Sequence, residues 1–481
     1  MSDQKKLAIK GGAGFLLSNV VSKGLGFVFI LISSRVLGPA EFGILSLGLS
    51  IISVLSSLGS FGLSSAIQRF FSGEGEKRRE QLFGSVLIVV SISALFFSLC
   101  LYFFSNDISL VIFNEPRLSI VLKVLSFGVA LNIFYQILSA VLKAQIKIKQ
   151  IVLGSTAKNF LRVLFLGIAF IWVRSAIIAV VAGISATFLT LLYIVKCVKR
   201  LELKFRFPAT TDLKKVIVYS LPLILVGFGY LLSQQIDRLM LGWLTSSTDV
   251  GIFSVVSRLA LIMGTFHSSL VSTFFPLASQ AYRNNEFEKL NETYLFISKW
   301  VGIINGLVSM IFAGFGIWIL GIFGSAYANE VSYQLLLLLS FTYFFGTWVG
   351  PTGALLQMSD GQRIEFYNTL LFLVMNIVLD YFFIRWFGLA GAAIGTSLAE
   401  ITRNIIQIIE IRYFYNLKVL PKESFLVFIV VFLTFFLCYM FGHIRIYVTL
   451  IAMVFLPGYM YKKMDKFELE MLKKAYHKFI K

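Results

Sequence analysis

Apolar runs of about twenty residues recur from one end of this chain to the other, separated by short polar breaks. A helix of that length crosses the roughly 30 Å hydrocarbon core of a bilayer. Of the 481 residues, 58% are hydrophobic and 14% are charged, and the mean hydropathy is +0.85. Soluble domains are about half apolar and a quarter charged. We therefore expect an all-α integral membrane protein with no sizeable soluble domain.

The positions of the breaks predict about fourteen transmembrane helices. At the junctions around Arg174 and Arg385, only a turn fits between adjacent helices. The expected spans are residues 13–35, 42–66, 82–104, 118–142, 150–173, 175–196, 216–241, 250–275, 294–318, 332–356, 364–386, 389–413, 423–441 and 446–461.

Lysine and arginine concentrate in alternate loops. If the N-terminus is cytoplasmic, basic stretches such as "KAQIKIKQ" and "KCVKRLELKFRFPATTDLKK" also lie inside, as does the tail after Met460. About thirty basic residues then face the cytoplasm and about five face outward, as the positive-inside rule requires. This pattern predicts a multi-pass protein of the plasma or inner membrane with both termini in the cytoplasm. It also accounts for the net charge of +19, so we expect no nucleic-acid partner.

Neither the cysteines nor the N-terminus adds a site. Cys100, Cys197 and Cys438 lie in or beside apolar runs, far apart and without metal-ligand spacing. We interpret them as packing residues, and we predict no metal and no cofactor. The start "MSDQKKLAIKGGAGF" has no short apolar region followed by a cleavage site, so we expect the first helix to stay in the mature chain.

One stretch of sequence occurs twice. "RVLGPAEFGILSL" from Arg35 is echoed by "RLMLGWLTSSTDVGIFSV" from Arg238, which aligns Gly38 with Gly242 and Gly43 with Gly251. "SAVLKAQIKIKQ" and "GALLQMSDGQR" form a second pair. The period of about 210 residues, or six helices, is far longer than a solenoid repeat. The chain is therefore predicted to contain a duplicated lobe, with each copy of the stretch forming a turn between two helices.

An even number of helices per copy makes the two copies parallel. Parallel repeats are related by a pseudo-twofold axis along the membrane normal, and transporters built this way bind substrate between halves that rock against each other. We predict two parallel six-helix lobes plus two C-terminal helices. The expected parts are a first lobe at 1–199, a basic cytoplasmic linker at 200–215, a second lobe at 216–415, two added helices within 416–462 and a basic tail at 463–481.

Ionisable residues inside a bilayer are costly, so each is a candidate functional residue. Lys23 and Arg162 lie near the centres of their predicted helices, and Arg258 lies about two turns inside its own. Lys158 and Arg162 are four apart and share a helix face. A cavity lined by these cations would attract an anion such as phosphate. The candidate substrate-binding residues are Lys23, Lys158, Arg162 and Arg258.

Other intramembrane charges are weaker candidates for substrate binding. Five lie near helix ends, where a side chain can reach the interface; these are Lys123, Asp237, Arg238, Lys299 and Asp380. Glu400 and Arg403 are three apart and are predicted to pair with each other. We keep four residues as candidates for the cavity wall or a gate, namely Arg35, Asp237, Arg238 and His267.

Several stretches resemble one family. "SSRVLGPAEFGILSL" and "QQIDRLMLGWLTSSTDVGIFSVVSRL" resemble paired landmarks of the polysaccharide flippases, and "GALLQMSDGQ" and "FGLAGAAIGTSLAE" resemble later ones. These flippases belong to the multidrug/oligosaccharidyl-lipid/polysaccharide exporter superfamily. The resemblance covers the first twelve helices. It implies an alternating-access flippase that moves a polyprenyl-(pyro)phosphate-linked oligosaccharide to the outer leaflet for assembly of cell-surface glycans.

The same resemblance implies the partners. These are the anionic lipid-linked oligosaccharide, membrane lipids and glycan-assembly proteins, with the chain expected to act as a monomer. In such flippases cationic cavity residues are thought to hold the pyrophosphate or acidic sugars, a part that Lys23 and Arg258 could play. The two helices beyond the repeat are typical of the lipid II flippase and of many polysaccharide flippases, whereas drug exporters of this superfamily usually have twelve helices.

Three alternatives stay open. A lipid II-type peptidoglycan precursor flippase and a cation-coupled multidrug exporter would share the fold. The exporter would need acidic residues deep in the first six helices, and the sequence places none there. A membrane glycosyltransferase or polymerase is the third alternative, but there is no Walker loop, metal-ligand cluster or nucleophile with a positioned base. We predict that the chain is not an enzyme.

Overall fold

The computed structural model describes residues 3–60, 62–71, 76–201, 218, 220, 228–229, 231–359, 361–420 and 422–462. Every regular element in this part of the chain is a helix, which confirms the all-α prediction. The predicted tail at 463–481 lies outside the described residues, as does the predicted linker at 200–215 beyond its first two residues.

The chain divides into two compact units. The first unit comprises Met1–Val255, Ile322–Tyr327 and Leu373–Ala392, and the second comprises Val256–Gly321, Ala328–Phe372 and Ala393–Lys481. The lobe boundaries expected from the repeat stay a prediction.

The helices begin and end close to the breaks in the apolar pattern. The earlier ones are α1 (Asp3–Gly59), α2 (Leu63–Phe71), α3 (Glu76–Phe103), α4 (Ser105–Asp107), the π-helix η1 (Ile108–Ile112), α5 (Pro116–Ala144), α6 (Ile148–Trp172), α7 (Ala176–Lys199), α9 (Ile236–Leu244) and α10 (Ser247–Ala260). The later ones are α11 (Ile262–Arg283), α12 (Phe287–Ile322), the 3₁₀ turn η2 (Ser325–Tyr327), α13 (Glu330–Val349), α14 (Thr352–Met358), α15 (Gln362–Phe387), α16 (Leu389–Tyr415), α17 (Lys422–Met440), η3 (Gly442–Ile444) and α18 (Arg445–Lys462).

Within the described ranges, nine helices are long and apolar enough to cross a membrane, or ten if α13 and α14, bent by 41°, form one span. A shorter apolar helix covers Ser424–Met440. The count of about fourteen and the cytoplasmic placement of the termini stay predictions.

A kink at Gly38 divides the long helix α1 into the two helices predicted at 13–35 and 42–66. Gly38 has φ +73° and ψ 174°, a backbone conformation that glycine adopts without the steric penalty of a side chain. Pro39 follows, and proline is well placed at the start of a helix because it has no N–H to leave unpaired. The first copy of the repeated stretch therefore forms a sharp turn inside one continuous run of helix.

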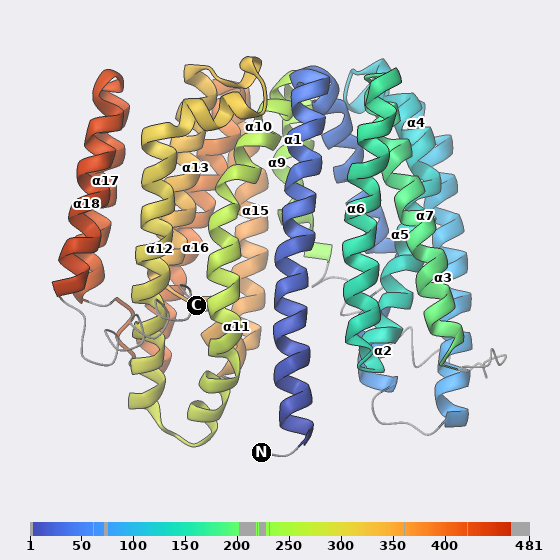
Figure 1. Cartoon of the computed structure of the whole chain (residues 1–481), viewed down its shortest axis with the longest axis horizontal. Coiled ribbons are helices and arrows are strands. Elements are labelled where there is room, and N and C mark those ends of the chain that lie inside the picture. The colour runs from blue at the N-terminus through green and yellow to red at the C-terminus, as the bar shows by residue number, and fades with distance from the viewer. Residues whose placement is uncertain are drawn as a thin grey trace, which may run out of the picture. The chain divides into compact units, whose positions relative to one another are not determined.

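Helix α5 lies at the centre of the first unit. It contacts α1, α3 and α7, while α6 packs against α1 and α7, and Figure 1 shows α5, α6 and α7 running side by side. Small residues on α1 permit the close approach of α5. A Cβ at Gly48 would lie 2.6 Å from a Leu125 methyl carbon, and one at Gly59 would lie 2.4 Å from a methyl carbon of Ile133. Small residues have this role wherever membrane helices pack closely.

Aromatic packing holds α17 against α13 in the second unit. The rings of Trp348 and Phe428 stack with their centroids 4.6 Å apart, and Trp348 Nε1 donates a hydrogen bond to the Ser424 carbonyl at 2.8 Å. Helix α18 packs in turn on α17. The predicted helix at 423–441 is thus joined to the rest of its unit by stacked rings and one buried hydrogen bond.

Replacing Trp348 by Phe keeps an aromatic ring but removes the hydrogen bond to Ser424, so we expect a loss of about 1 kcal/mol of stability. The measurement is thermal unfolding in detergent, followed by circular dichroism. Trp318→Phe is the matched control, because Trp318 is 65% exposed. Equal shifts in the two variants would contradict this account of α17.

Candidate functional site

The structure brings Lys158 and Arg162 together where α1, α5 and α6 meet. Lys158 Nζ donates a hydrogen bond to Asn132 Oδ1 at 3.1 Å and lies 4.4 Å from the centroid of the Tyr135 ring. The Arg162 guanidinium carbon lies 3.5 Å from the centroid of the Phe29 ring. The i, i+4 spacing on α6 therefore produces the shared cationic face that the sequence predicted.

Helix α1 is also tied to α6 beside these cations. Asn159 Nδ2 donates to the Ser22 carbonyl at 3.2 Å and to Ser22 Oγ at 2.6 Å. Both cations are half-buried. Lys158 donates its hydrogen bond to the side-chain amide of Asn132, which carries no negative charge. Aromatic faces attract cations without neutralising their charge. That these two cations form a surface to which an anion binds stays a prediction.

Lys23 and Arg258 lie in different units. Lys23 is exposed on α1, one residue after the Ser22 that contacts α6. Arg258 is exposed in the last turn of α10, in the second unit. A cleft shared by the two cations stays a prediction.

Arg35 and Arg238 both bind nearby groups of the first unit. Arg35 Nη1 donates to the Ile322 carbonyl at 3.2 Å. Arg238 is 6% exposed, and its Nη1 donates at 2.8 Å to Gln235 Oε1, which also accepts a hydrogen bond from Ser50 Oγ at 3.0 Å. Arg238 thus helps to join α9 to α1, a packing role that a count of intramembrane charges could not distinguish from a gate.

Two further candidates lie in the second unit. On α11, the Nδ1 atom of His267 is buried and has no hydrogen-bond partner among the described residues. On α16, Arg403 and Glu400 form the ion pair expected from their spacing. The pair is a structural contact between neighbouring turns of one helix.

A buried polar cluster was missed by the sequence analysis. Asp380 on α15 and Asp237 on α9 lie with their carboxyl groups against each other. Asp380 is 0% exposed, so its interpretation as a side chain reaching the interface is wrong. Asn376, one turn earlier on α15, is also 0% exposed, and its side-chain amide has no hydrogen-bond partner among the described residues. The group that faces the Asp380 carboxyl is the Asp237 carboxyl, which can share a hydrogen bond with it only if one of the two is protonated.

These three side chains suit a small cation or a proton. Burying the Asp380 and Asn376 side chains without a hydrogen-bond donor or acceptor of complementary kind costs several kcal/mol. Two adjacent carboxylates, Asp237 and Asp380, repel each other unless a positive charge lies between them. Carboxylate and amide oxygens are ligands for hard cations. Spacing along the sequence does not indicate this pair, because the fold brings Asp237 to Asp380 from a helix far away in sequence; the expectation of no metal stays a prediction.

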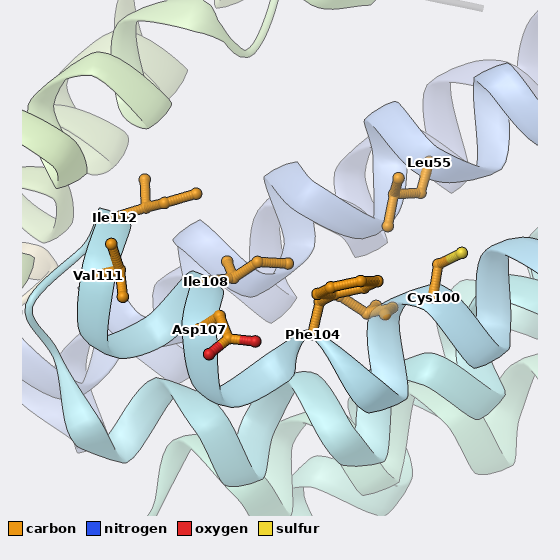
Figure 2. Close-up of a pocket in the computed structure, with 8 residues that line it drawn as sticks. Leu55, Cys100, Phe104, Asp107, Ile108, Val111 and Ile112 are labelled. Atoms are coloured by element: carbon orange, nitrogen blue, oxygen red, sulfur yellow. The ribbon is translucent and has the colours of Figure 1, made fainter.

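A separate apolar pocket of about 510 Å³ lies between α1 and the α3–α4–η1 segment. Figure 2 shows Asp107 beside Ile108 and Phe104, with Leu55 entering from α1. The lining residues are Leu55, Cys100, Leu101, Phe104, Asp107, Ile108, Val111 and Ile112. Its one charged residue is an exposed carboxylate, so this pocket does not suit an anionic head group.

Known proteins resemble this chain over most of its length. The chain is 23% identical over 416 residues to the probable low-salt glycan biosynthesis flippase Agl15 of Haloferax volcanii, covering 84% of this chain and 83% of Agl15. It is 25% identical over 423 residues to the uncharacterized membrane protein MJ1375 of Methanocaldococcus jannaschii, covering 82% of this chain and 96% of that protein. A shorter match, 26% identical over 212 residues, is to the capsular polysaccharide biosynthesis protein CapF of Staphylococcus aureus, covering 42% of this chain and half of CapF.

Solved structures share the fold. The inward closed conformation of the lipid II flippase MurJ superposes with a TM-score of 0.75 at 15% identity, covering 93% of this chain and 99% of MurJ. An inward-facing multidrug resistance MATE family transporter superposes with a TM-score of 0.65 at 19% identity, covering 84% of this chain and 94% of the transporter. These identities show the fold alone. They support the prediction of a multi-pass membrane protein.

Two family models match the chain. The MatE model matches residues 222–382, and the model described as "Polysaccharide biosynthesis protein" matches residues 8–282, more than half of the chain. The predicted resemblance to the polysaccharide flippases and their exporter superfamily is thereby confirmed, and the chain belongs to the polysaccharide biosynthesis protein family.

Proposed function

We propose that this protein is a flippase that moves a lipid-linked oligosaccharide with an anionic (pyro)phosphate from the cytoplasmic to the outer leaflet by alternating access. Family membership supports polysaccharide biosynthesis as the setting. Two relatives from Haloferax volcanii, Agl15 and AglR, are named as probable flippases. The fold is shared with a lipid II flippase and a MATE family transporter, and transporters built from two repeated halves bind their substrate between the halves.

The cationic face of α6 is the observation that carries the proposal. A diphosphate spread over several oxygens can accept hydrogen bonds from the Arg162 fork and from the Lys158 ammonium group together. Because Tyr135 and Phe29 hold these cations in place, little side-chain entropy is lost when an anion binds. The hydroxyl groups of an uncharged glycan could also accept hydrogen bonds from this pair, but bonds to an ionised phosphate are stronger, so we expect the phosphate to dominate recognition.

The buried carboxyl cluster supports a coupling ion. A cation or proton held by Asp237, Asp380 and Asn376 would neutralise charges that the bilayer otherwise penalises. Movement of that ion down its gradient would supply the free energy for one transport cycle. The ion's role is therefore to change the charge of α9 and α15, while the substrate binds to the cations on α6.

Two alternatives share the fold. A lipid II-type precursor also carries a pyrophosphate and would use the same cations. A multidrug exporter would take cationic compounds, which the positive face of α6 repels. The charge of the site therefore favours a lipid-linked anionic sugar over a drug.

Replacing Lys158 or Arg162 by Ala should reduce binding of the anionic lipid about tenfold to a hundredfold. A hydrogen bond to a charged group is worth about 1.5–3 kcal/mol, and about 1.4 kcal/mol corresponds to a tenfold change. Arg162→Lys should retain part of the activity, because it keeps the charge but loses the fork. The readout is the fraction of lipid-linked oligosaccharide accessible in the outer leaflet of cells in which this protein is the only flippase.

Arg174→Ala is the matched control, because Arg174 is an exposed cation in the turn between α6 and α7. Lys23→Ala and Arg258→Ala, made in the same assay, test the predicted contribution of these two cations. Full transport by the Lys158 and Arg162 variants would rule out the cationic face as the binding site.

Sodium is the first ion to test at the carboxyl cluster. An ion that binds only the folded protein stabilises it by about 2.7 kcal/mol at a hundred times its dissociation constant. We expect sodium chloride, compared with choline chloride at equal ionic strength, to raise the unfolding temperature of the wild type but not of Asp380→Asn or Asp237→Asn. If a proton is bound instead, sodium has no effect and the two variants lose the dependence of transport on the proton gradient.

Asp107→Asn is the control, since this exposed carboxylate lies at the separate apolar pocket. Transport by Asp380→Asn at the wild-type rate, with unchanged dependence on both gradients, would exclude the cluster from coupling.

A further inference from the structure

The two copies of the repeated stretch touch each other within the first unit. A Cβ at Gly43 would lie 1.6 Å from the carbonyl oxygen of Ser247, and a Cβ at Gly251 would lie 2.0 Å from the carbonyl oxygen of Pro39. Each glycine thus faces the carbonyl four residues before the other. The contact has local two-fold symmetry, and it pairs the same glycines that align in the sequence repeat.

No side chain fits at this crossing. The atoms that a Cβ would meet belong to backbone, so they cannot move aside as a flexible side chain would. An alanine at Gly43 or Gly251 therefore forces α1 and α10 apart. By contrast, a Cβ at Gly167 on α6 would meet nothing within 4 Å.

A chain of polar contacts surrounds the crossing. Glu115, the N-cap of α5, accepts a hydrogen bond from Ser247 Oγ at 2.8 Å and from Arg117 Nε at 2.9 Å. Arg117 Nη1 also donates to Glu41 Oε1 at 3.0 Å, and Glu41 Oε2 accepts from the Ala176 backbone N–H at 3.0 Å. We call Glu41, Arg117, Glu115 and Ser247 the clasp. It joins the starts of α5, α7 and α10 to the kink of α1.

The clasp persists at ordinary pH because its central carboxylate stays ionised. The hydrogen bonds from Arg117, assisted by the Ser247 hydroxyl, hold the pKa of Glu115 below its usual value. A lowered pKa means that the contact is present above the ordinary carboxyl pKa and is lost only as the pH falls through the lowered one. The clasp is also part-exposed. Water or another polar group can therefore replace the hydrogen bonds between its side chains without passing through a packed core.

Small polar side chains lie buried just beyond the crossing. Ser46 and Ser50 on α1 are 8% and 1% exposed, and Ser254 on α10 is 3% exposed. Such serines are small enough for close helix packing, and their hydroxyls can also bind water. They suit a surface that becomes wet when the two helices separate.

We propose that the Gly43–Gly251 crossing and the clasp form a gate at the predicted outer end of the transport path, which opens when α10 separates from the kink of α1. This proposal rests on the proposed function, because a flippase must open toward the leaflet that receives its substrate. The glycines set how closely the gate shuts, and the clasp holds it shut.

The test measures the opening without any substrate. A reporter cysteine replaces Ser46 in protein whose three native cysteines are changed to alanine, and a membrane-impermeant maleimide is added from the predicted outer side. Gly251→Ala, Ser247→Ala and Glu115→Gln should each raise the labelling rate of the reporter about tenfold, which corresponds to a modest shift in a two-state equilibrium. Gly167→Ala, the matched control, should leave it unchanged.

Size-exclusion chromatography checks that each variant is folded, and the Glu115 and Ser247 variants keep the test valid if Gly251→Ala fails to fold. An unchanged labelling rate in the folded variants would overturn the gate whether or not the protein transports lipid.

A second measurement links the gate to transport. Cysteines at Glu115 and Ser247, bridged by a short bifunctional methanethiosulfonate reagent, should stop flipping, and reduction should restore it. Continued flipping with the bridge verified by mass spectrometry would overturn the gate. Absence of flipping before the bridge is formed, with wild-type protein also inactive, would instead contradict the proposed function.

Discussion

A polar side chain inside a bilayer must find its partner within the protein, because the lipid offers none. Most of the intramembrane charges described above obey this constraint through short contacts. Lys158 binds Asn132, Arg238 binds Gln235, and Arg403 binds Glu400. The first of these contacts also joins two helices, α6 and α5, whereas the other two lie within a single helix or at its N-cap. Asp380, Asn376 and His267 depart from this constraint in the described residues, and the ion site proposed above would satisfy the first two.

The apolar pattern predicted the helices well because the length of a span is a physical requirement of the bilayer. The predicted breaks near residues 104, 174 and 387 fall within a few residues of the ends of α3, α6 and α15. Helix spacing also predicted that Lys158 and Arg162 share a face. Both predictions depend on neighbours in sequence, where geometry is nearly fixed.

Contacts between distant segments could not be obtained in this way. Asp237 and Asp380 meet only after α9 packs near α15, and their positions near helix ends suggested the interface instead. The repeat did give one long-range pairing, since Gly43 and Gly251 align in sequence and meet in space. The repeat predicted this pairing because two copies related by a twofold axis bring corresponding residues together only at that axis. Nothing in the sequence indicated that Glu115 and Arg117 would close around that axis.

In the proposed flippase, the site binds the substrate and the gate controls access to it, and the two depend on different kinds of interaction. Two cations held over aromatic rings recognise charge, while a glycine crossing and an ion-paired clasp hold helices together and can separate. In this proposal the protein recognises the phosphate rather than the glycan. The most direct measurement compares flipping in reconstituted vesicles of two lipids that carry the same oligosaccharide, one through pyrophosphate and one through an uncharged linker. We expect protein-dependent flipping of the pyrophosphate lipid alone, and equal rates for the two lipids would rule out recognition through the phosphate.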